Sequence, residues 1–491
     1  MNNKKVRKFY KGGVDVSSQE SKPKGNLISN FRDDMRDPKK RAIYTYSSSI
    51  NLAYNFIGYF VSTVTNIFLT DVAKLGVIMA GGMQIIQSFI KIAVAPITGT
   101  VFDKQPFKKG KYYPWLRYAP AALALTYGIF FIVPLMKISP ELLLPLMTAL
   151  LLIASCAQQV VFTIIYAIYP VVAKTPRDRV IGSTTTNIFK EVGKFLVGFS
   201  YPLLLVLFAD VLGGEGMGYL GTYLFFAAGC LLVFWFSSTE IIKSGAEEEV
   251  LQKEEKPKIK ASEMAKALFT NVPLMMAFCL EFLICIRSIG LGPLAPYYFK
   301  YVIEDERGLA VFLSIMPLVS VAFMFFAPVF IKICREQKLA SIISFSICAL
   351  CHLLVAWTPW GKTTLGVTML LAIGGGFSNV VSIINLNFFA GSCDYGHWKS
   401  GKDLPGLSMS LYPVAIQVGV LLATTIRTVL MNSMGYQADM VVTEAVKSGF
   451  INMISYSMAI PLIIAVVIAI LYPVSDKKLN QIREELNQRN A

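Results

Sequence analysis

Charged residues and histidines are scarce in this sequence. Only 16% of its 491 residues are charged and two are histidines, whereas soluble proteins are charged at about a quarter of their positions. All but Cys393 of the eight cysteines fall in or at the end of long apolar segments, without zinc-ligand spacing, so neither a disulfide framework nor a metal site is expected. Walker, nucleophile-elbow and dinucleotide-binding motifs are also missing. These absences predict a protein that is not an enzyme and needs no cofactor.

Long apolar runs take up most of the chain, of which 54% is hydrophobic. A run of about 20 apolar residues matches the ~30 Å hydrocarbon core of a bilayer. Twelve such segments can be recognised, near 42–69, 76–102, 114–136, 141–172, 184–209, 217–238, 271–299, 308–333, 339–360, 363–391, 406–433 and 447–473. They predict an all-α polytopic membrane protein with 12 transmembrane helices. No short apolar stretch of a cleavable signal peptide is recognised near the N-terminus.

The basic residues are distributed unevenly between the two sets of loops. If the N-terminus is cytoplasmic, 35 of the 46 lysines and arginines lie in cytoplasmic segments and six in the opposite loops. The positive-inside rule therefore predicts that both termini are cytoplasmic and that the chain lies in the plasma or inner membrane. Topology and anionic lipid headgroups explain the net charge of +15, so no nucleic-acid partner is expected. Five basic residues remain inside the segments: Lys91, Lys190, Lys194, Arg287 and Arg427.

The longest polar interruption between spans divides them six and six. The predicted organisation is a disordered basic cytoplasmic tail (1–41), an N-terminal six-helix bundle (42–238), a cytoplasmic linker (239–270), a C-terminal six-helix bundle (271–473) and a cytoplasmic C-terminal tail (474–491). This layout is typical of transporters with two pseudo-symmetric halves and a substrate site between them, near the middle of the bilayer.

Two loops carry a recognisable pattern. The first is PITGTVFDKQPFKKGKYYPW (96–115), in which a basic stretch follows Pro, Gly and an acid and precedes Gly-Lys-aromatic-x-Pro-Trp; the second is CDYGHWKSGKDLPG (393–406). Together with TDV (70–72), RDR (177–179), the segment 271–305 and MGY (434–436), they resemble the glycoside–pentoside–hexuronide:cation symporter family. The resemblance covers about residues 42–475. It implies the major facilitator fold, alternating access, a small-molecule substrate such as a sugar or glycoside, and a monomer in the lipid bilayer.

The residues that the family uses for sugar and cation are mostly replaced. Its span 1 acid falls on Asn55, its two span 2 cation acids on Lys91 and Ala95, and its span 4 acid on Ile165, with Tyr169 one turn later. Its span 5 arginine, span 10 tryptophan and span 11 lysine fall on Asn187, Ser382 and Gln417. A hard cation needs several oxygen ligands, so these replacements predict that the sodium site is lost.

Lys91 stands inside an apolar run, where insertion of an ammonium costs about 2.5–3.5 kcal/mol. One hypothesis is that Lys91 is a tethered substitute for the coupling ion. Transport would then be uncoupled, or coupled to protons if Lys91 itself titrates. The alternatives are a structural ion pair, a lysine that snorkels to the interface, or a misaligned span. Glu191 is the favoured partner, with Lys190 and Lys194 competing for it, and Glu281 is the other main intramembrane acid.

Polar residues recur at helical spacing within several spans. Asn51 and Asn55 share a face of span 1 with Ser62 and Asn66, and Gln84, Gln87 and Lys91 share a face of span 2. The expected substrate-binding residues are Asn51, Asn55, Gln87, Tyr169, Asn187, Ser382, Asn385 and Gln417. Hydroxyls and amides suit a cavity for a sugar, but they also join helices inside membranes.

The two patterned loops supply candidate gate residues. Asp103, Lys108 and Lys111 from the first, and Asp394 and Lys399 from the second, are expected to form cytoplasmic charge pairs that latch one state. The alternative is that these basic residues only set the topology. The sequence thus predicts a secondary transporter of a sugar or glycoside. The alternatives are a lysolipid or amphiphile carrier and a solute sensor that does not transport.

Overall fold

The computed structural model describes residues 38–104, 113–136, 138–172, 176–243, 269–400, 411–437 and 443–490. These residues are helical apart from short connections and contain no strand. Twelve helices in this part of the chain are long and apolar enough to cross a membrane, which confirms the predicted fold class. In the first half the elements are α2 (Pro38–Thr45), η1 (Tyr46–Ile50), α3 (Asn51–Ile67), η2 (Phe68–Val72), α4 (Val77–Lys104), α5 (Tyr113–Ile132), η3 (Val133–Leu135), α6 (Pro140–Val172), α7 (Pro176–Leu212) and α8 (Glu215–Lys243).

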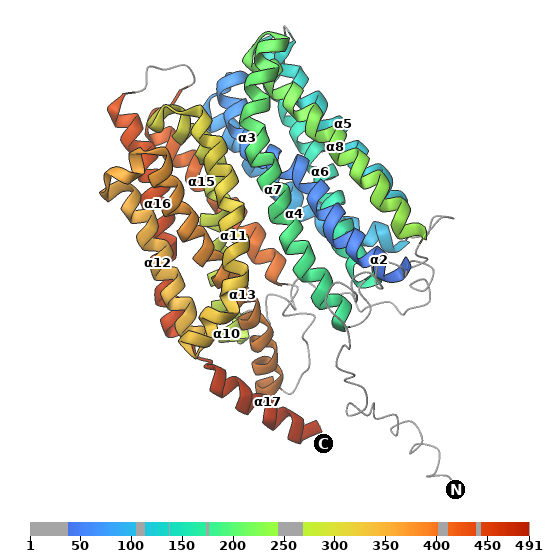
Figure 1. The fold of residues 1–491 in the computed structure, drawn as a ribbon, viewed down its shortest axis with the longest axis vertical. Helices are drawn as coiled ribbons and strands as arrows, with labels where there is room; N and C mark the ends of the chain where they lie inside the picture. Colours follow the sequence, from blue (N-terminus) through green and yellow to red (C-terminus); the bar gives the residue numbers. More distant parts are fainter. Residues whose placement is uncertain are drawn as a thin grey trace.

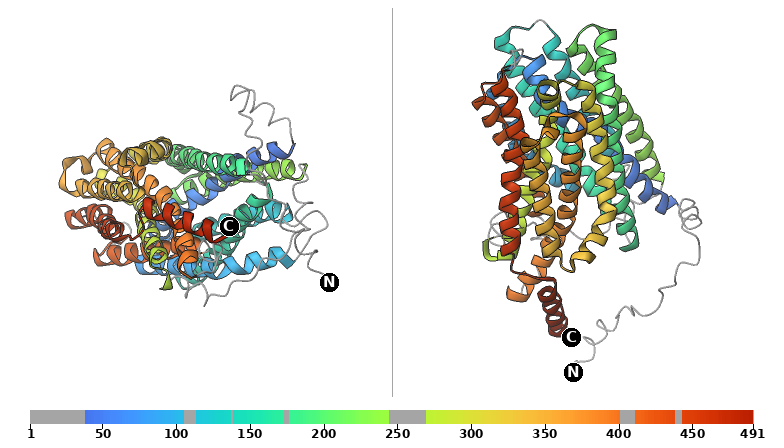
Figure 2. Two further views of the ribbon diagram at one scale, coloured as in Figure 1. Left: turned by 90° about the horizontal axis from the view of Figure 1, so that it is seen from below. Right: turned by 60° about the vertical axis from the view of Figure 1, so that its left-hand side comes forward.

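The second half also contains six spans, which are followed by a shorter helix. Its elements are α10 (Val272–Tyr298), η4 (Phe299–Ile303), α11 (Glu306–Cys334), α12 (Gln337–Trp357), η5 (Pro359–Lys362), α13 (Thr364–Ser400), α15 (Leu411–Ser433), α16 (Glu444–Leu471) and α17 (Asp476–Asn490). Figure 1 shows the two halves as adjacent bundles, with α2 and α17 at the same end. We call this the near end, and we call the opposite end, where Asp71 and Tyr436 lie, the far end. Helix α17 extends from the near end below the second half (Figure 2).

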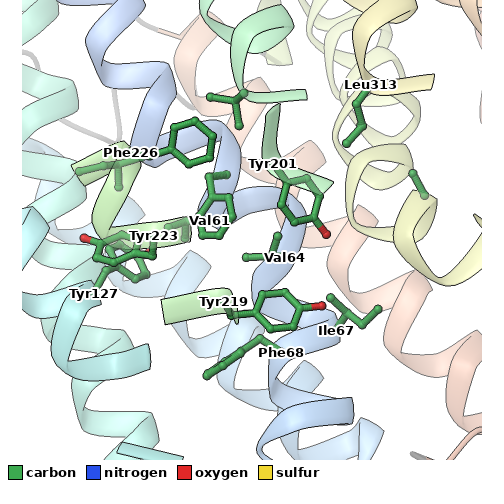
Figure 3. Packing of buried hydrophobic residues seen from close by; sticks show 14 of the residues in the cluster. Val61, Val64, Ile67, Phe68, Tyr127, Tyr201, Tyr219, Tyr223, Phe226 and Leu313 are labelled. Atoms are coloured by element: carbon green, nitrogen blue, oxygen red, sulfur yellow. The ribbon is translucent and has the colours of Figure 1, made fainter. Parts of the chain in front are cut away.

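In the described part of the chain, the hydrophobic core runs from one half into the other toward the far end. One cluster contains buried side chains from helices α3 through α8 together with far-end residues of the second half, such as Tyr297, Leu313 and Phe450. A second cluster, which includes Leu274 and Tyr472, lies entirely within the second half. Figure 3 shows the aromatic part of the first cluster, where Tyr219 and Phe68 pack near α3 and Leu313 approaches from the second half. Burial of apolar side chains therefore holds the halves together at the far end.

Two glycines allow the halves to approach closely. A Cβ added to Gly198 on α7 would overlap the Leu313 carbonyl on α11, and one added to Gly81 on α4 would overlap the Thr428 side chain on α15. The interface between the halves therefore runs along the pairs α7–α11 and α4–α15, with additional contact between α3 and α10.

Candidate functional site

A buried carboxylate connects the halves at the far end. Asp71, in η2 at the end of the first span, is 4% exposed. From the second half, the Lys300 ammonium lies 3.0 Å from it, and the hydroxyls of Tyr301 and Tyr436 donate to it at 2.6 Å and 2.8 Å. The Thr70 hydroxyl donates to it from its own half at 2.8 Å. Burial, and then the negative charge of Asp71, raise the pKa of the Tyr436 hydroxyl, so this group stays a hydrogen-bond donor.

The hydrogen bonds continue inward from Asp71. Arg427 on α15 donates from Nη2 to Gln84 Oε1 on α4 at 2.5 Å. Gln84 donates to Asn66 Oδ1 on α3 at 2.8 Å, and Asn66 donates to the Tyr297 hydroxyl on α10 at 2.8 Å. The Tyr297 hydroxyl lies 2.8 Å from that of Thr70, which closes the path back to Asp71. We call this set the far-end network; its members are Asn66, Thr70, Asp71, Gln84, Tyr297, Lys300, Tyr301, Arg427 and Tyr436.

This network was not predicted from the sequence, although a signal for it was present. Asp71 lies in TDV, Tyr436 in MGY, and Tyr297 and Tyr301 within 271–305. These segments served only as evidence for the family resemblance. Arg427 was noted only as an intramembrane charge. Because an intramembrane charge needs a polar partner or a functional role, Arg427 together with Gln84 was the sequence feature that pointed here.

Lys91 has no partner in the described part of the chain. It is half-buried on α4, about 20 Å from either helix end at 1.5 Å per residue. It makes no hydrogen bond and no ion pair with any described residue. The favoured partner, Glu191, instead receives Lys194 Nζ at 2.6 Å within α7. Gln87, on the same face as Lys91, donates to the Tyr127 hydroxyl at 3.4 Å.

The substrate-binding candidates of span 1, Asn51 and Asn55, donate hydrogen bonds to backbone carbonyls of their own span. Asn51 donates to Tyr46 O and Ser47 O at 3.4 Å, and Asn55 donates to Asn51 O at 2.7 Å. Both side chains are at most 8% exposed. The donor ends of these two amides are therefore satisfied locally, which leaves their oxygens as the groups that could bind a ligand.

The remaining substrate candidates differ in environment. Asn187 is exposed and Gln417 is half-buried. Ser382 donates to Ser378 O at 3.1 Å, and Asn385 donates to Glu281 Oε2 at 2.6 Å. The side chain of Tyr169 lies outside the described residues.

Arg287 lies in a separate buried cluster of the second half. It donates to His352 Nε2 at 3.1 Å and to Leu371 O at 3.2 Å, and His352 Nδ1 lies 2.8 Å from Ile454 O. These contacts join α10, α12, α13 and α16, so the role visible for Arg287 is to hold four helices of one half together.

Only the second-half residues of the expected near-end gate lie fully within the described part of the chain. Lys108, Lys111 and the side chain of Asp103 lie outside the described residues. Asp394 receives Arg483 Nε of α17 at 2.8 Å, and Lys399 lies 5.9 Å from the Tyr395 ring. The contacts seen for both residues are thus made within the second half and its C-terminal helix, not with the first half.

The near and far ends therefore differ in how the halves are joined. Among the described residues, the charged and polar bonds between the two six-helix halves gather in the far-end network.

Comparison with known proteins agrees with this architecture. Residues 46–476 match the family described as MFS/sugar transport protein. The chain is 25% identical over 451 residues to an uncharacterized symporter, YnaJ, of Bacillus subtilis, covering 90% of this chain and 94% of that one. It is 22% identical to the isoprimeverose transporter of Lactiplantibacillus pentosus, covering 86% of each chain. It is also 22% identical to a putative sulfoquinovose importer of Escherichia coli, over 86% of this chain and 88% of that one.

Solved structures show the same fold. The nucleoside transporter NupG superposes with a TM-score of 0.58 at 14% identity, covering 88% of this chain and 98% of that one. A bacterial homologue of the human drug peptide transporters PepT1 and PepT2 superposes with a TM-score of 0.63 at 11% identity, covering 91% and 99%. The resemblance to the glycoside–pentoside–hexuronide:cation symporters is thereby confirmed, and the chain belongs to the MFS/sugar transport protein family of multi-pass membrane transporters.

Proposed function

We propose that this chain moves a small sugar or glycoside across the membrane by alternating access, without sodium. The observation that carries the proposal is the far-end network, because its bonds join the two halves and have to break before the far end can open. The relatives named for isoprimeverose and sulfoquinovose support a sugar-like substrate. The amide and hydroxyl groups of Asn55, Gln87 and Ser382 are the kinds of group that bind sugar hydroxyls.

Lys91 supports the absence of sodium. In the related symporters the equivalent place on span 2 helps to hold a monovalent cation, and here it carries an ammonium with no anion among its described neighbours. Two further acid positions of the family, on spans 2 and 4, fall on Ala95 and Ile165, which offer no carboxylate. A fixed positive charge at this depth would repel a sodium ion.

The unpaired ammonium also favours a second candidate, in which the solute is an acidic sugar and Lys91 is its counter-ion. Two relatives are named for acidic sugars, sulfoquinovose and a glucuronide. Lys190, exposed on α7, is a second cation without an ion-pair partner among the described residues.

Substrate counterflow in proteoliposomes tests these proposals. The panel contains neutral sugars, glycosides, acidic sugars and lysolipids, each measured with and without sodium, for the native protein and for Lys91→Ala. We expect sodium-independent counterflow of a sugar. A neutral sugar whose sodium-independent counterflow is lost in Lys91→Ala supports the tethered-cation role, and an acidic sugar that Lys91→Ala no longer binds supports the counter-ion role.

The same panel separates the alternatives. Counterflow of a lysolipid alone would identify an amphiphile carrier, and binding without counterflow would identify a sensor. Sodium stimulation of the native protein would show that span 2 is misaligned and that a sodium site exists elsewhere.

A further inference from the structure

Arg427 on α15 is a buried cation at the contact between the two halves. It is 4% exposed. Its Nη2 donates to Gln84 Oε1 on α4 at 2.5 Å, and this acceptor is a neutral amide. Its Nε is buried and has no hydrogen-bond acceptor among the described residues. Because a buried charged donor without an acceptor is costly, this side chain is suited to bind a ligand that accepts a hydrogen bond.

The far-end network holds one more positive than negative charge. Its charged members are Asp71, Lys300 and Arg427, so a single carboxylate faces two cations. The Asp71 carboxylate lies 3.0 Å from the Lys300 ammonium, whereas neutral side chains of the network separate it from Arg427. Glu215 lies 3.9 Å from Lys300, but its side chain is 54% exposed, so water and salt screen its charge. The charge of Arg427 is therefore the one that remains uncompensated.

The helices that pack against α15 bring no acid to Arg427. These helices are α4, α10 and α16, and their acids are Asp103, Glu281 and Glu444. Asp103 is 19 residues from Gln84, about 28 Å along α4. Glu281 accepts a hydrogen bond from Asn385 at 2.6 Å, and the Glu444 side chain is 89% exposed. Helix α15 itself contains no acid, so the counter-charge has to come from a ligand.

The size of the excess charge and the burial of Arg427 indicate which ligand fits. One excess positive charge is neutralised by a monovalent anion. A small halide ion gives up less hydration on entering a buried place than a doubly charged sulfate or phosphate does. Lys91, the other cation of this interface without a described partner, is only half-buried, and the long stem of a lysine lets its ammonium reach water.

We propose that Arg427 binds a halide ion such as chloride and that this ion stabilises the closed far end. The ion accepts a hydrogen bond from Arg427 Nε and neutralises the excess charge of the far-end network. Arg427 belongs to the second half and its partner Gln84 to the first, so the ion lies beside the contact between α4 and α15. When the halves separate, water solvates Arg427 and weakens its attraction for the ion. This inference goes beyond the proposed transport function and holds for any transported solute.

The first test compares thermal unfolding of the native protein in two salts. The purified protein is heated in detergent with sodium chloride or with sodium gluconate at equal ionic strength, since gluconate is too large for a buried site. We expect the Tm to be higher in chloride by about 1–2 °C, and we expect this difference to saturate as chloride replaces gluconate. Equal Tm values, or a difference that grows without saturation, would overturn the proposal.

A second test supplies the missing negative charge from the chain itself. Gln84→Glu places a carboxylate beside Arg427, so the Tm should no longer depend on chloride. The matched control is Gln87→Glu, the same substitution three residues further along α4, where the new carboxylate lies one turn from Lys91. This control should keep the chloride dependence of the native protein. Loss of the dependence in Gln87→Glu, or its persistence in Gln84→Glu, would overturn the assignment to Arg427.

A third measurement locates the ion in the native chain and does not depend on the folding of any variant. Crystals in which the far end is closed are grown in bromide, and the anomalous scattering of bromide is mapped. We expect a peak at hydrogen-bonding distance from Arg427 Nε, between α4 and α15. Absence of a peak there, or peaks only at exposed lysines and arginines, would overturn the proposal and show that no halide compensates the charge of Arg427.

Discussion

The Lys300 ammonium lies 3.0 Å from the Asp71 carboxylate, and this ion pair joins the two halves of the molecule at the far end. Its acid side is 2% exposed and its lysine side 27% exposed, so the pair is only partly shielded from water. Two tyrosine hydroxyls of the second half add to it. Because all these donors come from the other half, the same contacts that neutralise Asp71 also close the far end.

Replacing Asp71 should open the far end. Asp71→Asn removes the negative charge that Lys300, Tyr301 and Tyr436 share. We expect the closed state to lose about 2 kcal/mol, less than the ~3–5 kcal/mol of a fully buried pair because Lys300 reaches water. That corresponds to a roughly thirtyfold population shift. The readout is thiol labelling of Met431→Cys, a 1% exposed position beside Asn66, in purified protein without the eight native cysteines.

The matched control for this prediction is Glu304→Gln. Glu304 pairs with Lys447 at 2.6 Å at the same end, but both residues belong to the second half. Its loss should leave the labelling of Met431→Cys unchanged. Equal labelling of the Asp71 and Glu304 variants would show that the ion pair does not hold the halves together.

Tyr436→Phe should give an intermediate effect. The ring can still pack against Tyr297 and Phe450, while the hydroxyl that donates to Asp71 is lost. Lys300 and Tyr301 still bind the Asp71 carboxylate, so the loss should be smaller than the ~2 kcal/mol expected for Asp71→Asn. Labelling of Met431→Cys should therefore lie between that of the native protein and that of Asp71→Asn. Labelling at the native rate would show that the Tyr436 hydroxyl does not help to hold the far end closed.

The fold was accessible from the sequence because it depends on properties that are local along the chain. The length of each apolar run fixes whether a helix can span the bilayer, and the 12 runs correspond to the 12 spanning helices in the described residues. The shared faces of Gln84, Gln87 and Lys91 also follow from helical periodicity alone.

The pairing of polar residues could not be predicted in the same way. Periodicity shows which face of α4 carries Gln84, but it does not show that Arg427, 343 residues away, meets it. Glu191 was a plausible partner for Lys91. It pairs with Lys194 instead, because residues three apart lie on the same face of one helix. Asp394 likewise lies beside Arg483, a residue that the sequence placed in a C-terminal tail. Such contacts depend on helix packing and on which end of the molecule is closed.

Two adjacent glycines on α4 provide a steric test of the closure. A Cβ on Gly81 would overlap Thr428 of the other half, whereas a Cβ on Gly82 would meet nothing within 4 Å. Gly81→Val should therefore separate α4 from α15 and increase the labelling of Met431→Cys. Gly82→Val changes the same helix by the same side chain and should leave labelling unchanged. Equal effects of the two variants would assign the change to helix propensity rather than to contact between the halves.

The cap of α11 gives a prediction about pH. Asp305 accepts hydrogen bonds from the Thr364 hydroxyl at 2.8 Å and from the Gly308 N–H at 3.0 Å. These two bonds hold the pKa of the Asp305 carboxyl below its ordinary value. A carboxyl group with a depressed pKa adds stability above its unfolded pKa, and that stability is lost as the pH falls through the folded value. Asp305→Ala should destabilise the protein by about 0.5–2 kcal/mol at pH 7, the usual range for a lost cap.

Thermal unfolding in detergent, followed from pH 7 down to pH 3, checks this prediction with Asp305→Asn as the matched variant. Asparagine also caps helices well, but it carries no titrating charge. The Asn variant should therefore keep most of the stability at pH 7 and lack the part of the acid dependence that the native carboxyl contributes. The gap between the native protein and the Ala variant should narrow toward pH 3. A gap that stays constant with pH would show that Asp305 stabilises the helix by its shape and hydrogen bonds and not by its charge.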